Sequence, residues 1–88
     1  MELDPMELSA AINRIKRAQG QLGGVLRMIE EGRTCEEVVT QLAAVSRALD
    51  RAGFSIVANG LVQLLAHPEQ NVDGVDVKKM EKLFLSLA

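Results

Sequence analysis

The chain has 88 residues, of which 48% are hydrophobic and 25% are charged, and its formal net charge is −2. This length and balance predict one small globular domain, exclude a disordered chain and argue against a general binder of polyanions. Because the chain has a single cysteine, no basic leader and no long apolar run, we expect no internal disulfide, no signal peptide and no membrane span. A cytoplasmic protein with a reduced thiol is therefore expected.

The first predicted element is an amphipathic helix over about residues 7–31, preceded by a short acidic arm at residues 1–6. Its apolar residues recur mostly at steps of three and four, which is the spacing of one helix face. They are Leu8, Ala11, Ile12, Ile15, Ala18, Leu22, Val25, Leu26 and Ile29. Gly20, Gly23 and Gly24 lower the helix propensity of this segment. They indicate either close approach by another helix or a ligand backbone, or a local weak point.

Basic charge is concentrated on the same segment. Residues 13–33 carry Arg14, Lys16, Arg17, Arg27 and Arg33 against Glu30 and Glu31. Arg14, Arg17 and Gln21 step by three and four, so they share a face away from the apolar stripe, with Lys16 nearer its flank. Such a face could bind phosphates, with Gln21 adding hydrogen bonds to phosphates or base edges. A solvated helix face is the alternative, and no helix-turn-helix pattern is present.

The single cysteine follows the turn after this helix. Gly32 ends the first helix, and Thr34 is predicted to cap a second one, with Glu37 completing a capping box. Cys35 then occupies the first helical position, where unpaired backbone N–H groups favour a thiolate that binds metals or reacts with electrophiles. Arg33 favours the thiolate, whereas the glutamates that follow oppose it. The alternative is a buried, inert thiol.

Two further helices are predicted, over about residues 35–66 and 74–87, joined by a polar loop at residues 67–73. The longer helix has a seam with steps of four and three, typical of coiled-coil packing. Its members are Val38, Leu42, Val45, Leu49, Ala52 and Ile56. Apolar residues off this seam require a second partner. We therefore expect an all-α protomer of two long antiparallel helices and a short C-terminal helix, which dimerises as an antiparallel four-helix bundle.

Catalytic motifs are absent from the sequence. There is no glycine-rich phosphate loop after a strand, no CxxC or HExxH motif and no Ser/His/Asp constellation. With one His and one Cys, an enzyme site within one protomer is not expected.

Three segments carry motifs of recognisable composition and spacing: residues 12–21 (INRIKRAQGQ), 28–35 (MIEEGRTC) and 38–45 (VVTQLAAV). They resemble the CsoR/RcnR family of metal-sensitive transcriptional repressors, which includes sensors of copper, nickel, formaldehyde and persulfide. The resemblance extends from about Leu8 to Leu61.

The resemblance implies an assembly and a DNA-binding surface. It implies that the four-helix dimers pair into a homotetramer and that the basic face of the first helix binds operator DNA. Arg14, Lys16, Arg17 and Gln21 match that region, and Arg51 matches a basic position on the second helix. It also implies an inducer that acts at Cys35 and releases the DNA.

The sequence departs from the family at the inducer site. In copper and nickel sensors the cysteine matching Cys35 acts with two ligands, four residues apart, on the partner's second helix; the matching positions here are Gly60 and Leu64, which cannot bind a metal. Persulfide sensors have a second cysteine at the position of Gly60, and formaldehyde sensors have Pro where this chain has Glu2. His67, two helical turns after Gly60, is the remaining candidate to hold a transition metal ion together with the partner's Cys35 in an antiparallel dimer, the alternative being a solvated His at a helix end.

Two functions remain open. In the first, residues 1–88 form a single DNA-binding and sensor domain of a repressor that is not an enzyme. Its partners are operator DNA and further copies of the chain, with no membrane, and an inducer releases it at Cys35 through thiol modification or atypical metal binding. In the alternative, the chain is a helical structural or interaction protein that has lost inducer sensing. The inducer, the operator and the regulated genes are not identified by the sequence.

Overall fold

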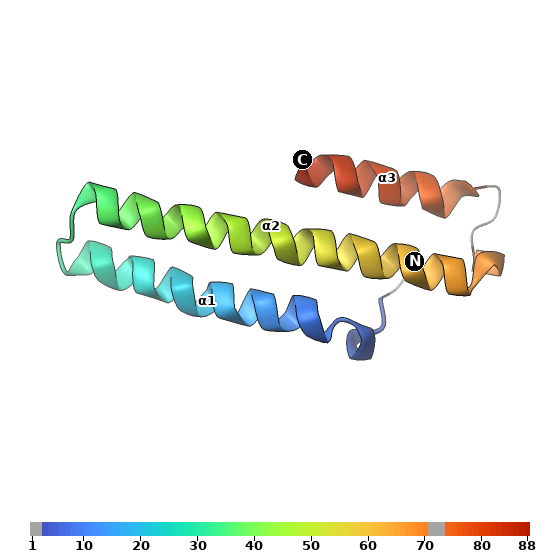
Figure 1. The fold of residues 1–88 in the computed structure, drawn as a ribbon, viewed down its shortest axis with the longest axis horizontal. Coiled ribbons are helices and arrows are strands. Elements are labelled where there is room, and N and C mark those ends of the chain that lie inside the picture. Colours follow the sequence, from blue (N-terminus) through green and yellow to red (C-terminus); the bar gives the residue numbers. More distant parts are fainter. Residues whose placement is uncertain (1–2, 71–73) are drawn as a thin grey trace.

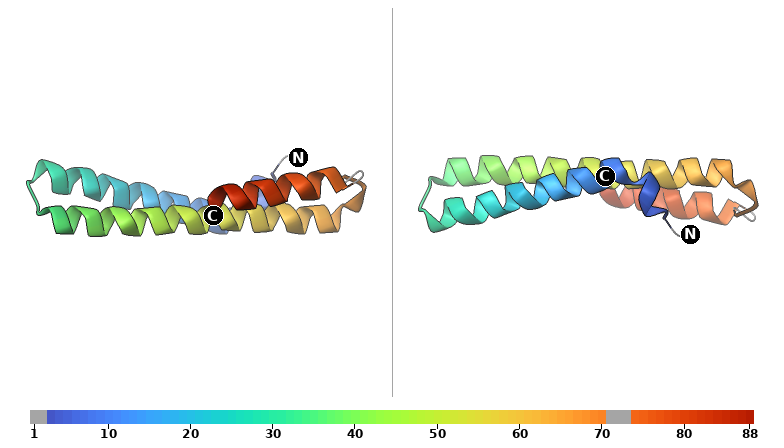
Figure 2. Two further views of the ribbon diagram at one scale, coloured as in Figure 1. Left: turned by 90° about the horizontal axis from the view of Figure 1, so that it is seen from above. Right: turned by 90° about the horizontal axis from the view of Figure 1, so that it is seen from below.

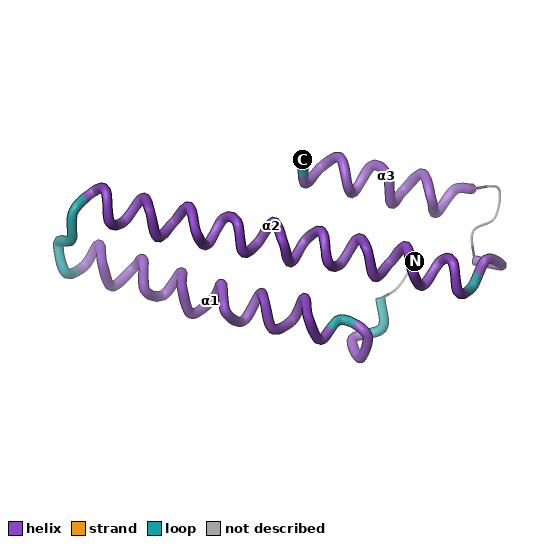
Figure 3. Tube along the Cα trace, in the orientation of Figure 1, coloured by secondary structure: helices purple, strands orange, loops and turns teal. Residues whose placement is uncertain are grey.

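Two long antiparallel helices, α1 (Ser9–Glu30) and α2 (Cys35–Ala66), form a hairpin, and the shorter α3 (Val75–Leu87) folds back along α2 (Figure 1). The computed structural model describes residues 3–70 and 74–88, so predictions for Glu2 and for loop residues 71–73 fall outside the described residues. Within those ranges the regular structure is helical and no strand is present (Figure 3). The all-α prediction of three helices is therefore confirmed, whereas the dimer and tetramer remain predictions.

The predicted arm is partly helical. Pro5–Glu7 forms a 3₁₀ helix, because proline suits the first helical position and the Asp4 side chain accepts a hydrogen bond from the Met6 N–H at 3.0 Å. The expected boundary between the arm and the first helix is thus replaced by a short helical turn that leads into α1. A second 3₁₀ helix, Pro68–Gln70, follows α2.

The turn between α1 and α2 is formed by residues with local signals. Gly32 has φ 71°, a left-handed conformation that glycine adopts readily. The Arg33 N–H donates to the Met28 carbonyl at 2.9 Å and the Gly32 N–H donates to the Ile29 carbonyl at 3.1 Å, which is a Schellman motif. This motif ends α1 and fixes the direction in which the chain enters α2.

Small side chains fill the contact between α1 and α2. The buried residues are Ala11, Ala18 and Val25 on α1, and Val45 and Ala52 on the facing part of α2. Much of the larger apolar stripe predicted for the core is instead exposed in the protomer, by 37–58%. These residues are Ile12, Ile15, Leu22, Leu26, Ile29, Leu42 and Leu49. They are exposed because one neighbouring helix covers only part of a wide apolar face.

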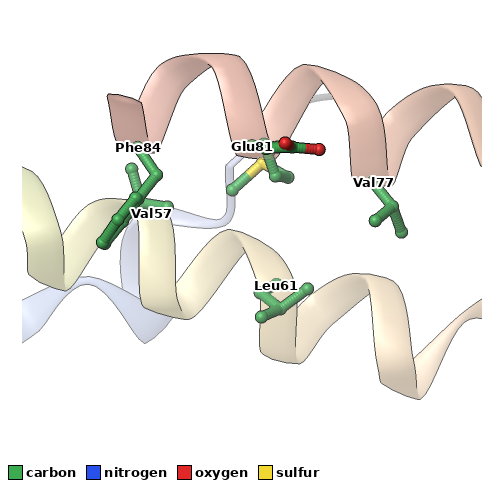
Figure 4. Close-up of a pocket in the computed structure, with 6 residues that line it drawn as sticks. Val57, Leu61, Val77, Glu81 and Phe84 are labelled. Carbon is green, nitrogen blue, oxygen red and sulfur yellow. The ribbon is translucent and has the colours of Figure 1, made fainter. Parts of the chain in front are cut away.

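The helix α3 packs on a different side of α2 from α1, as the views of Figures 1 and 2 show. Met80 is 6% exposed, and the Phe54 and Phe84 rings lie with centroids 5.3 Å apart. A Cβ built at Gly53 would lie 2.9 Å from a Leu87 methyl carbon, so glycine allows the end of α3 to approach α2 closely. The two helices border an apolar groove of about 250 Å³ (Figure 4), lined by Val57, Leu61, Val77, Met80, Glu81 and Phe84.

Close approach, one of the two explanations offered for the glycines of α1, does not occur among the described residues of the protomer. A Cβ at Gly20 would meet nothing within 4 Å, and at Gly23 or Gly24 it would meet only the Arg27 guanidinium, at 3.7 Å. Among the described residues, none of the helices combines the length and hydropathy of a membrane span.

Candidate nucleic-acid interface and thiol site

Three arginines from two helices surround one hollow in the surface. Arg14 and Arg17 of α1, together with Ala48 and Arg51 of α2, line a hollow of about 80 Å³. The antiparallel hairpin brings them together, because Arg14 and Arg51 lie equally far along the chain from the turn at residues 31–34. The sequence predicted Arg14 and Arg17 on one face of the first helix, and the family resemblance added Arg51; the structure places all three around the same space.

The hollow is electropositive. Within the described residues none of its arginines forms an ion pair. The ion pairs of the described residues lie elsewhere and involve Arg33, His67 and Lys79. The helix α1 carries no acidic residue before Glu30. Guanidinium groups offer planar forks of donors that match phosphate oxygens, so this cluster can bind a phosphate group.

The other two residues predicted for the basic face are placed differently. Lys16 is exposed but does not line the hollow. Gln21 is half-buried, and its Oε1 is buried without a hydrogen-bond partner within the described residues. Gln21 follows Ala18 by three residues and precedes Val25 by four, and both of these residues are buried. Gln21 therefore lies beside the buried stripe of α1. We expected the Gln21 side chain on the surface beside Arg14. This expectation is wrong for the side-chain carbonyl oxygen of Gln21, which is buried.

The capping box before α2 is only half formed. Thr34 Oγ1 accepts a hydrogen bond from the Glu37 N–H at 3.2 Å, as predicted. The Glu37 carboxylate, however, accepts from Arg33 Nε at 2.5 Å, and Arg33 Nη1 lies 3.9 Å from a Glu31 carboxylate oxygen. Arg33 is thus held by two carboxylates beside Cys35. The Cys35 side chain itself is exposed in the protomer, not buried.

Within the described residues of one protomer, no group of side chains fits a transition metal ion. Gly60 and Leu64 are buried on α2 and provide no donor atom. His67 is 58% exposed, with Nδ1 3.4 Å from a Glu69 carboxylate oxygen, and lies at the opposite end of α2 from Cys35 (Figure 1). A helix of this length spans about 48 Å. Over the described part of the chain, no three His, Cys, Asp or Glu residues are grouped so as to hold a metal.

Sequence reasoning missed Ala48. This residue is half-buried, packs against the core formed by Ala18, Val25 and Val45, and lines the arginine hollow. Counting residues in both directions from the turn pairs Ala48 with Arg17, so the antiparallel register could have identified it.

Known proteins that the chain resembles are described as transcriptional repressors that sense metals. A profile of the metal-sensitive transcriptional repressors matches residues 7–86. The copper-sensing transcriptional repressor CsoR of Mycobacterium ulcerans is 44% identical over 52 residues, which are 59% of this chain and 44% of the relative. The copper-sensing transcriptional repressor RicR of Mycobacterium tuberculosis is 43% identical over 54 residues, 61% of this chain and 52% of the relative.

A more distant relative is the copper-sensing transcriptional repressor CsoR of Bacillus subtilis, 29% identical over 62 residues, which are 70% of this chain and 61% of the relative. The chain therefore spans less than two thirds of the length of these relatives. No solved structure matches the chain.

Proposed function

The chain belongs to the metal-sensitive transcriptional repressor family, and from this premise we propose that it is a repressor that binds operator DNA through its basic α1–α2 face. The observation that carries this proposal is the convergence of Arg14, Arg17 and Arg51 on one hollow, without an acidic partner in the described residues. Phosphate contacts of this kind position a protein on DNA and supply much of its affinity. Lys16 and Gln21 complete the proposed DNA-binding set.

The proposed assembly is a dimer that forms an antiparallel four-helix bundle, with dimers pairing into a tetramer. It is supported by the large apolar side chains that α1 and α2 leave exposed, including Leu22, Leu26 and Leu49. A protomer of this size gains stability by burying such a face against another copy. Two-fold symmetry would duplicate the basic face, which suits an operator with two half-sites.

The proposed sensing residue is Cys35. Its side chain is exposed at the first position of α2, the helix that also carries Arg51. The two residues lie about 24 Å apart along the helix axis, at 1.5 Å per residue. An inducer that displaces the start of α2 against α1 would change the spacing of Arg51 from Arg14 and Arg17. Thiol modification accounts best for such an inducer, because Gly60 and Leu64 offer no donor atoms to a metal.

The test uses fluorescence anisotropy with a duplex from the region upstream of the protein's own gene and a shuffled duplex as control. We expect preferential, salt-sensitive binding to the upstream duplex. Intact-mass spectrometry after separate exposure to Cu(I), Ni(II), Zn(II), formaldehyde and a persulfide should identify the agent that adds to the protein. That agent should release DNA from the wild type but not from Cys35→Ala. Equal release from both proteins would exclude Cys35 as the sensor.

A second candidate is a helical interaction protein that has lost sensing. The observation that favours it is the burial of Gly60 and Leu64, where the family resemblance places ligands. Equal affinity for the upstream and shuffled duplexes at physiological salt would support this alternative over the repressor.

A further inference from the structure

We propose that the hollow between Arg14, Arg17 and Arg51 is a socket for a single phosphate group, and that Ala48 sets its size. The inference rests on the proposed function in one respect, since the DNA backbone is one source of the phosphate. The other source is free inorganic phosphate, which has the same tetrahedral oxygens.

The volume of the hollow restricts what can enter it. It measures about 80 Å³. A site for one water needs about 10–15 Å³ by a comparable measure, and a cavity of about 150 Å³ accommodates benzene. The space therefore matches the size of a small oxyanion, which the three arginines can contact at one place.

The hollow owes its shape to small residues at the helix contact. Ala18 and Ala52, which are both 2% exposed, bring α1 and α2 close together at this level. Ala48 lines the hollow between the arginines of the two helices. A larger side chain at this position would occupy the space left for the anion while every charge stayed in place.

The chemistry of the lining selects an anion with several acceptor oxygens. Each guanidinium can donate two parallel hydrogen bonds, and charge-assisted bonds of this kind are about twice as strong as neutral ones. Asp50 adjoins Arg51 in the sequence but forms no ion pair with the socket within the described residues. The like charges of the arginines therefore repel one another until an anion binds between them.

The first test titrates the protein with inorganic phosphate and follows backbone amide shifts by NMR, with chloride at matched ionic strength as reference. We expect saturable shifts around Ala48 in the wild type. Arg51→Gln should weaken phosphate binding roughly tenfold or more, the effect of losing a hydrogen-bonded charge.

Arg47→Gln is the matched control, because Arg47 is exposed one helical turn earlier on α2 and does not line the hollow. It should change phosphate binding by less than about twofold, as expected for weakly coupled surface charges. Equal weakening by both variants would overturn the socket.

The second test changes the size of the hollow at constant charge. Ala48→Leu should abolish saturable phosphate binding, whereas Ala48→Ser, which stays small, should retain it. Unchanged binding in Ala48→Leu, with an unchanged circular dichroism spectrum, would contradict the proposal. If Ala48→Leu does not fold, the comparison of Arg51→Gln with Arg47→Gln still decides.

Measurements of DNA binding distinguish the DNA backbone from free phosphate as the anion that enters the socket. They also test the socket and the repressor separately. If the socket takes the DNA backbone, phosphate should displace the upstream duplex more strongly than chloride at equal ionic strength, and Arg51→Gln should remove that difference. Saturable phosphate binding without specific DNA binding would support the socket as a site for the free anion and would refute the repressor. Specific DNA binding that is unaffected by Arg51→Gln, in a protein that shows no saturable phosphate binding, would refute the socket and leave the repressor standing.

Discussion

The two parts of α2 have opposite characters. Its first part, residues 35–52, packs on α1 through small side chains such as Ala52 and carries Arg51 at the arginine hollow. Its second part, residues 53–66, packs on α3 through Met80 and the Phe54–Phe84 pair. The family resemblance places a DNA contact, Arg51, on the first part and the two inducer ligands that act with Cys35 on the second. In this chain the basic residue is present, whereas the two ligand positions are Gly60 and Leu64, which are buried. The first part therefore keeps the proposed anion surface, while the second part serves packing.

The largest effect is expected where α3 packs on the second part of α2. Met80→Ala removes a side chain that is 6% exposed against α2 and should lower the free energy of unfolding by about 2–5 kcal/mol. Leu85→Ala is the control on the same helix, since Leu85 is 61% exposed. Urea unfolding at one fixed protein concentration measures both. Similar losses for the two variants would show that α3 does not pack on α2 as described.

The next largest effect is expected on DNA binding, at the hollow between α1 and the first part of α2. Arg14→Gln should weaken binding to the upstream duplex by about 10–100-fold, since hydrogen bonds to charged groups contribute about 1.5–3 kcal/mol. Lys16→Gln removes the same charge from the same helix but outside the hollow, and should weaken binding several-fold less. Anisotropy titrations at one salt concentration compare them. A larger loss for Lys16→Gln would place the DNA face elsewhere on α1.

A smaller effect on stability is expected at the N-cap of α2. Thr34→Ala removes the acceptor of the Glu37 N–H and should lower stability by about 1 kcal/mol. Thr40→Ala, at an exposed position inside the same helix, should be neutral or slightly stabilising because alanine has the higher helix propensity. Thermal unfolding of the two variants, compared with the wild type, measures the difference. Equal changes in the midpoint would contradict the observed cap.

The smallest effect tests the ion pair beside Cys35. Arg33 and Glu37 have side chains that are 49% and 41% exposed, so their pair should contribute only about 0.3–0.5 kcal/mol. Glu37→Gln should destabilise slightly more than Glu36→Gln, which removes the same charge from the same helix end. High salt should abolish this difference. A difference that persists at high salt would indicate a contribution other than the ion pair.

Local signals made much of the fold predictable. Gly32 and Thr34 act through their own neighbours in the chain, so the turn and the start of α2 follow from the sequence, and the observed helix ends lie within two residues of the expected ones. The convergence of Arg14 and Arg51 follows from the antiparallel hairpin. The burial of the Gln21 carbonyl and the approach of Leu87 to Gly53 could not be predicted, because both depend on how two helices rotate against each other. The role of Ala48 depends on the same rotation.

The salt dependence of DNA binding tests the central claim most directly. The affinity for the upstream and shuffled duplexes is measured over a range of salt concentrations for the wild type and for Arg51→Gln. The account predicts a preference for the upstream duplex and a linear fall of log affinity with log salt. It also predicts a slope that is smaller by about one for Arg51→Gln, as expected when one phosphate contact is lost. Equal affinity for the two duplexes, or an unchanged slope in Arg51→Gln, would contradict it.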